Sequence, residues 1–411
     1  MTAAERRLIA YTTIAHALVH SIEVTYAVLL LRIQLDFGTS DVLMGVIASI
    51  FGWAFGATAI PAGFLTDRLG SRRVLYYTFV GATGAAVLVG LSPNQWFLAG
   101  ALALLGLTIG LYHPAGISLI AQGVRQRGLG LGYHGVSGNL GLALTPLIAG
   151  GLASAFDWRA AYFLMAGLAG VVALMLGATR LPVQGESEVV SPHDPLVSEG
   201  ATARLATPKT NSTLVPLLLV YLAFVFNGFV YRGVITFLPS HIHDEVSANL
   251  GDALTTVALL TGAAGQYVGG ALSQRVQLER LAPLIVMLAV PSLFLTGIIE
   301  GGPLVVFAAA LIFFNFAGQP VFTGLIADYT PARLLGRSYG ISFFASFGLA
   351  SVGSTYAGFF ADRWNTTSAV FTALTPFAAA TLLIAATLWL ISLRRPLLAP
   401  SEAESQPPVT L

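Results

Sequence analysis

The sequence contains no cysteine and very little charge, and both shortages narrow what this chain can be. Without cysteine, neither a disulfide framework nor a metal site built on thiolates can form. Charged residues make up 9% of the chain, whereas they make up about 25% of soluble domains. The net charge of +1 gives no reason to expect a nucleic-acid partner. Hydrophobic residues make up 55%, and the mean hydropathy is +0.78, so we expect most of the chain to lie in lipid.

Long apolar runs predict helices that cross a membrane. A spanning helix needs about 20 mostly apolar residues. Twelve segments qualify: 8–35, 42–66, 73–92, 96–122, 130–155, 158–180, 213–240, 250–274, 281–300, 302–328, 336–361 and 367–393. Runs such as Leu98 to Ile109 are continuously apolar, whereas strands of a transmembrane barrel alternate between apolar and polar residues. The sequence therefore predicts an all-α membrane protein with 12 transmembrane helices.

A motif from the first half of the chain returns in the second half. Gly63-Phe-Leu-Thr-Asp67-Arg68 recurs, loosened, as Gly270-Ala-Leu-Ser-Gln274-Arg275, 207 residues later. Other pairs keep nearly the same offset: Pro114 with Pro320, Gln122 with Asp328, Arg125 with Arg333, and Gly132 with Gly340. A constant offset predicts two parallel repeats related by an axis along the membrane normal.

The repeat also divides the chain into parts. We expect a six-helix bundle over 1–180, a cytoplasmic linker over 181–212, a second six-helix bundle over 213–395 and a disordered tail over 396–411. The linker is rich in proline, acidic residues and serine, which is typical of flexible segments. The two bundles are expected to enclose a central cavity.

Basic residues are distributed unevenly between the two sides of the predicted membrane domain. The termini and the even-numbered connections hold 16 of the 20 basic residues, whereas the odd-numbered connections hold only Arg159 and Arg363. Basic loops stay on the cytoplasmic side, so both termini are predicted to be cytoplasmic. The apolar stretch after Arg7 is long enough to span and is predicted to be retained as the first helix, not cleaved as a signal. We expect a multi-pass protein of the inner (cell) membrane.

The loop after the second predicted helix has a recognisable motif. Its sequence, Gly63-Phe-Leu-Thr-Asp67-Arg68-Leu-Gly70-Ser-Arg72-Arg73, resembles the signature loop of the major facilitator superfamily. The resemblance implies alternating access, in which the two halves rock around a central site. It also implies a cytoplasmic gate made of Asp67, Arg68, Arg72 and Arg73.

The position of Asp67 gives the gate a physical basis. A carboxylate at this helix end can face the positive N-terminal end of a helix in the other half, expected near Gly336. In the second repeat Gln274 precedes Arg275 and replaces the acid, while Asp328 ends the tenth predicted helix. We assign Arg275 and Asp328 to the same gate. The alternative is that these basic loops only fix the topology.

The fourth and fifth predicted helices carry a narrower resemblance. Leu111-Tyr112-His113-Pro114-Ala115-Gly116 and Gly132-Tyr133-His134-Gly135-Val-Ser137-Gly138-Asn139-Leu-Gly141 are similar to bacterial fosmidomycin-resistance-type efflux transporters. This resemblance implies export of a small organic compound, with an anionic compound among the options. The stretch Gly141-Leu-Ala-Leu-Thr145-Pro146 approximates the glycine-proline motif of antiporters. The sequence therefore predicts proton-coupled export by an antiporter.

Ionisable residues inside predicted helices are the first candidates for the transport site, because a charge at membrane depth is unfavourable unless it faces a cavity or a partner. His16, His20, Glu23 and Tyr26 follow one another at spacings of four and three, which places them on one helix face. We predict that Glu23 binds and releases protons. The alternative is a carboxylate held permanently by a neighbouring arginine.

Arg232 is the predicted partner of Glu23. The two residues are 209 positions apart, close to the repeat offset, and belong to equivalent helices. The planar guanidinium of Arg232 suits an anionic group of a substrate, so Glu23 and the substrate would compete for it. The alternative is that Arg232 extends to the membrane surface.

Further polar residues are expected around the cavity. His113 precedes Pro114, and Gln319 precedes Pro320, so the two prolines are predicted to form matching hinges. His113 and His134 are candidates for a proton relay or for simple packing. Asn139, Asn227 and Gln319 must face protein or water.

These features favour one function class over two others. The glycines of Gly128-Leu-Gly130-Leu-Gly132 are not followed by Lys-Ser or Lys-Thr, so no phosphate-binding loop is predicted. A secondary transporter of a small solute, coupled to protons, is therefore expected, with a lipid flippase or a uniporter as the alternative. The family resemblance implies a functional monomer. An enzyme is not expected, because His16, His20 and Glu23 on one helix do not fit the usual His-Glu-x-x-His arrangement and no Ser-His-acid set stands out. No metal or cofactor is predicted.

Overall fold

The computed structural model describes residues 1–178, 214–331 and 334–393, with the backbone only at positions 127 and 128. These residues are all helical or in short connections, and no strand occurs among them. The all-α prediction is therefore confirmed. The predicted linker and the predicted tail lie outside the described residues.

The first half of the chain begins with one long helix. The helices of this half are α1 (Ala3–Phe37), α2 (Asp41–Ala57), α3 (Ala59–Leu69), α4 (Ser71–Gly90), α5 (Gln95–Ile109), α6 (Tyr112–Gly123), α7 (Arg127–Thr145), α8 (Gly151–Ala155) and α9 (Trp158–Ala178). A π-helical turn, Pro146–Gly150, joins α7 to α8. Ser, Thr and Asn side chains cap the N-terminal ends of α1, α2 and α5, as expected of residues that accept bonds from unpaired N–H groups.

The second half repeats this order. Its helices are α10 (Leu214–Glu245), α11 (Gly251–Ser273), α12 (Leu278–Ile298), α13 (Gly302–Tyr329), α14 (Leu335–Phe343), α15 (Val352–Trp364) and α16 (Ser368–Leu393). A π-helical turn, Phe344–Gly348, and a 3-10 turn, Leu349–Ser351, lie between α14 and α15.

Eleven of the expected spans are long and apolar enough to cross a membrane by length and composition, among the residues that the structure describes. The segment Gly251–Ser273 (α11) is long enough, at 23 residues, but is not among the eleven. It is rich in glycine, threonine and other small or polar residues. Its length and its place in the helix order still match the eighth expected span, 250–274.

Proline explains one break that separates a predicted span into two helices. The ring of a helical proline clashes with the carbonyl four residues earlier, and Gly110, four residues before Pro114, lies in the turn that separates α5 from α6. A side chain at Gly110 would also collide with Thr58 and with the Phe55 carbonyl of α2. By contrast, Pro320 lies inside the continuous helix α13. In this structure the helix is therefore interrupted near one of the two prolines only, and the matching hinges stay a prediction.

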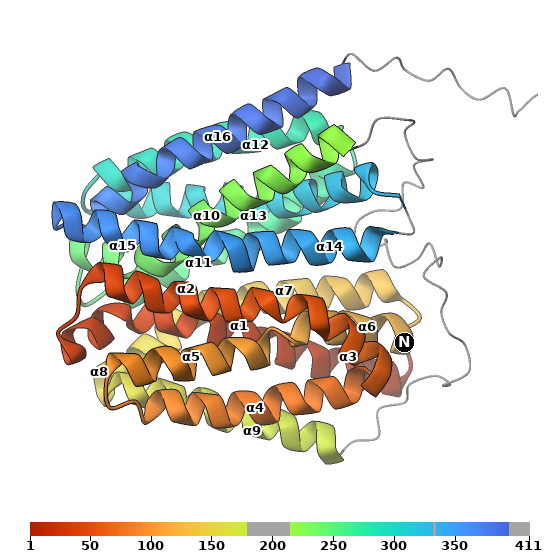
Figure 1. Cartoon of the computed structure of the whole chain (residues 1–411), viewed down its shortest axis with the longest axis horizontal. Helices are drawn as coiled ribbons and strands as arrows, with labels where there is room; N and C mark the ends of the chain where they lie inside the picture. The colour runs from red at the N-terminus through yellow and green to blue at the C-terminus, as the bar shows by residue number, and fades with distance from the viewer. Residues whose placement is uncertain (179–213, 332–333, 394–411) are drawn as a thin grey trace, which may run out of the picture.

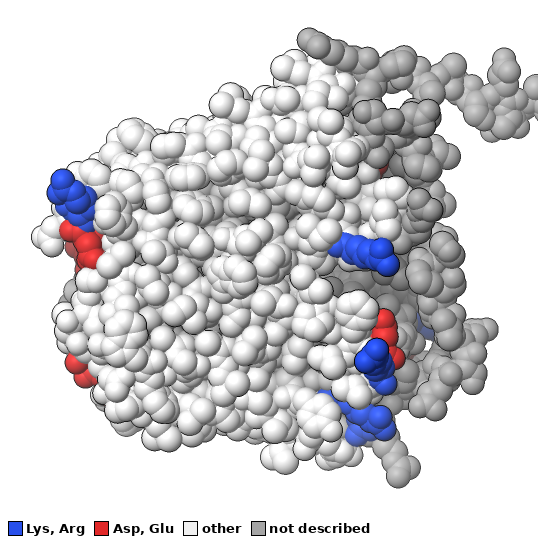
Figure 2. Space-filling model, in the orientation of Figure 1, with Lys and Arg blue, Asp and Glu red and all other residues white. Residues whose placement is uncertain are grey.

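The two halves lie side by side, with the N-terminus at one end of the molecule (Figure 1). In that view α2 runs next to α15, and α3 and α14 diverge toward the N-terminal end. Figure 2 shows the charged residues of this face gathered at its two ends, with an uncharged band between them. Such a band matches the hydrocarbon part of a bilayer.

The halves are in contact at the end opposite the N-terminus, which we call the closed end. Arg32 of α1 pairs with Asp252 of α11 at 3.0 Å. The Asp362 carboxylate accepts the backbone N–H groups of Asp41 at 2.8 Å and of Val42 at 2.9 Å. Because the first N–H groups of a helix have no partner within it, an acid of one half caps a helix of the other.

At the N-terminal end the halves are apart. A methyl group added to Gly63, Gly70, Gly336 or Gly340 would meet no atom within 4 Å. At the closed end, by contrast, a methyl group on Gly45 would collide with the Ser354 backbone. Among the described residues, the two halves are therefore in close contact at the closed end, and α3 and α14 diverge at the N-terminal end (Figure 1).

Candidate functional site

An ion pair joins the two halves in the middle of the molecule. Glu23 of α1 and Arg232 of α10 lie 3.1 Å apart, measured from Oε1 to Nη1. Both residues are buried, with 8% and 5% of their surface exposed. Buried charges are strongly unfavourable unless they are paired. Arg232 therefore does not extend to the membrane surface.

The guanidinium of Arg232 retains capacity for a ligand. Its Nε and Nη2 groups are buried and have no hydrogen-bond partner among the described residues. The Arg232 Cζ atom lies 4.7 Å from the centre of the Phe347 ring, a cation–π contact from the second half. A pocket beside the pair is lined in part by Glu23, Tyr231 and Thr236. Two neighbouring guanidinium nitrogens with free N–H groups are what a carboxylate or sulfonate binds.

Two hydroxyl groups donate hydrogen bonds to the backbone of Arg232, and the sequence did not point to either of them. The Arg232 carbonyl accepts from Thr236 Oγ at 2.7 Å and from Ser354 Oγ at 3.1 Å. Thr236 follows Arg232 by one helical turn, which sequence spacing can indicate. Ser354 comes from α15, and only the packing of the helices brings it near.

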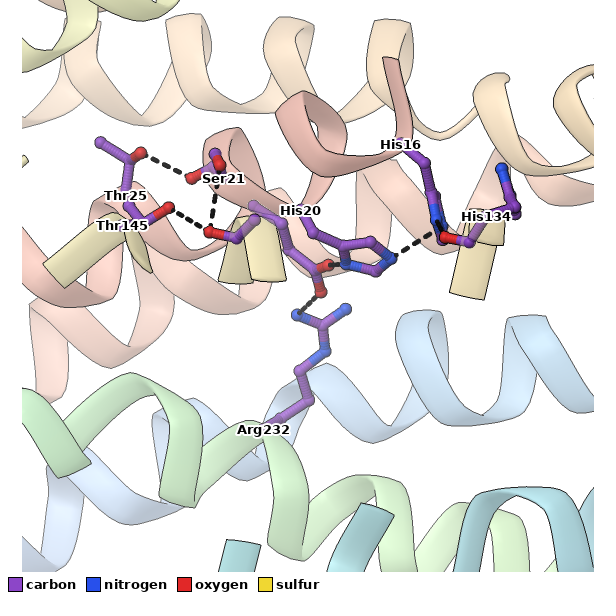
Figure 3. Close-up of polar contacts among 9 residues, drawn as sticks. His16, His20, Ser21, Thr25, His134, Thr145 and Arg232 are labelled. Atoms are coloured by element: carbon purple, nitrogen blue, oxygen red, sulfur yellow. Dashed lines mark hydrogen bonds and ion pairs between the residues drawn. The ribbon is translucent and has the colours of Figure 1, made fainter. Parts of the chain in front are cut away.

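Histidines extend the ion pair into the first half (Figure 3). His20 Nδ1 lies 2.8 Å from Glu23 Oε2, and His20 Nε2 lies 3.1 Å from His16 Nε2. His16 Nδ1 in turn lies 2.6 Å from the carbonyl oxygen of His134. The predicted helix face of α1 is thus continuous, and α7 supplies the last member of the chain.

His113 of α6 joins the same group. Its ring centre lies 5.2 Å from that of His16 and 5.3 Å from that of His20. The Phe343 ring of α14 lies 5.2 Å away on the side of the second half. The spacing within α1 alone did not predict a metal site. In the structure, however, His113 of α6 lies beside His16 and His20 of α1, so a third histidine comes from another helix.

The other predicted cavity residues have different environments. The Tyr26 hydroxyl lines the pocket region and donates to the Met44 carbonyl at 2.9 Å. Asn139 of α7 donates to Gln266 of α11 and so joins the two halves. Asn227 and Gln319 are half-buried.

The predicted gate residues are not assembled. Asp67, Arg68, Arg73 and Arg275 are exposed, and Asp67 makes no ion pair with another described side chain. The expected contact of Asp67 with the helix near Gly336 is therefore wrong for this conformation. The reason is that the halves are apart at this end. Asp328 is half-buried at the end of α13.

Arg72 has a local role that the sequence analysis did not foresee. Its Nη2 donates to the carbonyls of Leu176 at 2.8 Å and Gly177 at 3.2 Å, and its Nε donates to Leu176 at 3.1 Å. The last carbonyls of a helix have no partner within it and carry partial negative charge. Arg72 therefore caps the C-terminal end of α9.

Comparison with known proteins gives the family. The sequence model of the Major Facilitator Superfamily matches residues 12–354. A probable L-galactonate transporter of Escherichia coli (strain K12) is 24% identical over 359 residues, covering 81% of this chain and 78% of that protein. A probable sulfoacetate transporter of Cupriavidus necator is 24% identical over 302 residues, covering 68% of each chain.

A solved structure shows the same fold. The crystal structure of a bacterial homologue of the human lysosomal transporter Spinster, inward-facing and occupied, matches with a TM-score of 0.73 at 15% identity. The match covers 96% of this chain and 98% of that chain. With most of its length matched to the family, this multi-pass membrane protein belongs to the Major Facilitator Superfamily and is a transporter, not an enzyme.

Proposed function

We propose that this protein is a proton-coupled secondary transporter of a small organic anion. The observation that carries the proposal is the buried pair of Glu23 and Arg232, which bridges the two halves and leaves two guanidinium nitrogens of Arg232 without a partner among the described residues. In this proposal the bundles 1–180 and 213–395 move as units around that pair. The end with the N-terminus faces the cytoplasm, in keeping with the basic loops.

The substrate class follows from the chemistry of Arg232. A buried guanidinium with free N–H groups binds carboxylate, sulfonate or phosphonate through two parallel hydrogen bonds. Relatives named for transport of L-galactonate and sulfoacetate, both anions, support the same class. A lipid substrate fits less well, because the pocket contains a charged pair between the halves. We therefore place the flippase alternative second.

The competition for Arg232 provides the coupling. An ionised Glu23 holds the guanidinium and repels an incoming anion, whereas a protonated Glu23 does neither. The proton and the anion consequently favour each other's binding, and such a coupling is reciprocal. His20, hydrogen-bonded to Glu23 at 2.8 Å, is the group that passes the proton to and from it.

Two arguments disagree on whether the anion and the proton move in opposite directions or in the same direction. The resemblance of α6 and α7 to fosmidomycin-resistance-type transporters favours export by exchange for protons. The competition at Arg232 favours movement of proton and anion in the same direction, because both occupy the site together. We give the second more weight, since it rests on the contact between Glu23 and Arg232.

A flux experiment tests the function. Purified protein is reconstituted in liposomes that contain a pH-sensitive dye, and galactonate, sulfoacetate and phosphonates are added outside. Co-transport acidifies the lumen when the substrate is added, and exchange makes it more alkaline. Glu23→Gln should lose the proton movement but keep exchange of labelled anion. Glu300→Gln, an exposed acid, serves as the matched control.

The outcomes separate the alternatives. Anion movement without a pH change, equal in Glu23→Gln and the wild type, would indicate a uniporter. Movement of fluorescent lipid between leaflets, with no anion transported, would indicate a flippase and contradict the proposal.

A further inference from the structure

The four histidines beside Glu23 form a compact group that the transport scheme uses only through His20. We call His16, His20, His113 and His134 the histidine cluster. The ring centre of His16 lies 4.7 Å from that of His20, 5.2 Å from that of His113 and 3.7 Å from that of His134. Three separate helices, α1, α6 and α7, supply them.

Hydrogen bonding fixes which nitrogen of His16 carries hydrogen. His16 Nδ1 lies 2.6 Å from the carbonyl oxygen of His134, and a carbonyl oxygen can only accept. Nδ1 must therefore carry the hydrogen. A neutral imidazole has only one N–H group, so Nε2 of His16 has a free lone pair.

The same reasoning applies to His20. Its Nδ1 lies 2.8 Å from a carboxylate oxygen of Glu23, whose other oxygen pairs with Arg232. An ionised carboxylate is only an acceptor, so Nδ1 of His20 donates to it. Nε2 of His20 then has a free lone pair as well.

Two lone pairs consequently face each other. The Nε2 atoms of His16 and His20 lie 3.1 Å apart, and in neutral rings no hydrogen lies between them. A cation is needed to stabilise this arrangement. Two imidazole nitrogens bound to one zinc ion, each at about 2.0–2.1 Å, lie about 3.3 Å apart in tetrahedral geometry. The observed separation is close to that of two ligands of one ion.

A third histidine offers the further ligand that a metal ion takes and a shared proton does not need. One ring nitrogen each from His16, His20 and His113 can be chosen so that all lie within 4.8 Å of one another. Nε2 of His113 is buried without a hydrogen-bond partner among the described residues. A proton joins two nitrogens, whereas a metal ion takes three or more.

A fifth histidine shows how a structural histidine looks in the same protein. Both ring nitrogens of His241 have partners, Thr367 Oγ at 2.9 Å and the Thr296 carbonyl at 2.9 Å. The cluster differs because Nε2 of His16 and Nε2 of His20 have only each other as partner, and Nε2 of His113 has none, among the described residues.

We propose that His16, His20 and His113 form a binding site for one divalent transition-metal ion of the zinc class. Imidazole nitrogen is a preferred ligand of Zn²⁺, Ni²⁺ and Cu²⁺ but not of Mg²⁺. The His134 carbonyl and the Glu23 carboxylate orient the first two rings from behind, as partners of metal-bound histidines commonly do. Glu23 also supplies negative charge, and Arg232 on its other oxygen supplies positive charge.

Metal binding to the purified full chain tests the site without any substrate. Zn²⁺ alone is titrated into chelator-treated protein in detergent by calorimetry, with Co²⁺ and its visible absorption spectrum as a second probe. One ion per chain is expected to bind, and His113→Ala and His20→Gln should each weaken binding by more than about 10-fold. His243→Ala, a half-buried histidine outside the cluster, should bind as the wild type does. Mg²⁺ should not compete.

Two results would overturn the site. The first is the absence of saturable Zn²⁺ binding, and the second is binding that both His113→Ala and His20→Gln leave unchanged. If His113→Ala does not fold, as judged by gel filtration, His113→Gln replaces it. Transport is assayed in chelator-treated buffer, in which His20 has no metal bound and can pass a proton to Glu23, so the site and the transport proposal can fail separately.

Discussion

At the scale of single residues, the Glu23–Arg232 pair has the largest consequences. Each charge is buried and is stabilised chiefly by the other. Removal of one partner leaves an uncompensated charge in a region of low dielectric constant. The pair therefore contributes to stability and to ligand binding at once, and variants must separate the two contributions.

A double variant measures what the Glu23–Arg232 pair contributes to stability, apart from ligand binding. Arg232→Ala should lower the free energy of unfolding by about 3–5 kcal/mol, because Glu23 stays buried without its partner. Adding Glu23→Gln should restore a large part of that loss, since a neutral amide tolerates burial better. Thermal unfolding in detergent measures both. A double variant as unstable as the sum of the single variants would show that the two residues do not interact.

The pH dependence of anion affinity measures what the pair contributes to ligand binding. In the wild type, the affinity for the anion should rise as pH falls, because protonated Glu23 releases Arg232. In Glu23→Gln the affinity should be high and independent of pH. The difference between the extremes should be about 5–150-fold, the usual range of a coupling between two sites. Equal pH dependence in the two proteins, measured by calorimetry, would contradict the coupling.

At the scale of elements, the ends and breaks of helices show how neighbouring helices change the effect of a residue. The break between α5 and α6 lies four residues before Pro114, whereas α13 continues through Pro320. A proline in a helix thus produces a break only where neighbouring helices allow one. Arg72 also depends on its neighbours, because it donates to a carbonyl at the end of α9 and to no other predicted gate residue that the structure describes.

The cap of α9 leads to a prediction about stability. Arg72→Ala should destabilise the protein by about 0.3–2 kcal/mol, because two carbonyls at the end of α9 lose a charged donor. Arg73→Ala should change stability less, since Arg73 is exposed. Thermal unfolding of the two variants side by side measures this. If both lose the same stability, net charge of the loop and not the cap would be the cause.

At the scale of the whole molecule, the two ends of the structure differ. Pairs such as Arg32 with Asp252 join the halves at the closed end, and glycines there allow backbones to touch. At the N-terminal end the halves are apart. Alternating access requires the closed-end contacts to break and others to form, so small changes at the closed end should shift the balance of conformations.

A glycine substitution tests that balance. A methyl group at Gly45 would collide with the Ser354 backbone, so Gly45→Ala should favour opening of the closed end. The chain has no cysteine, so spin labels at Leu35→Cys and Leu250→Cys, both exposed, report the distance between the halves. Longer distances are expected in Gly45→Ala. Gly84→Ala, which meets no atom within 4 Å, is the control, and equal distance distributions would contradict the prediction.

The sequence by itself determined the class and the order of the parts. Apolar runs, the repeat offset and the positions of Glu23 and Arg232 in equivalent helices are local patterns, and local patterns are readable without coordinates. Helix boundaries were less certain, because neighbouring helices decide where a break such as that before Pro114 forms.

Only the tertiary structure decided which distant groups meet. It placed His113 of α6 against His16 and His20 of α1, and it left Asp67 without its expected contact. The same packing brings the His134 carbonyl of α7 to Nδ1 of His16, and so decides that this nitrogen carries the hydrogen. The physical reason is that periodicity assigns a residue to a face of its own helix, whereas its partner depends on how whole helices pack and on which end of the molecule is closed.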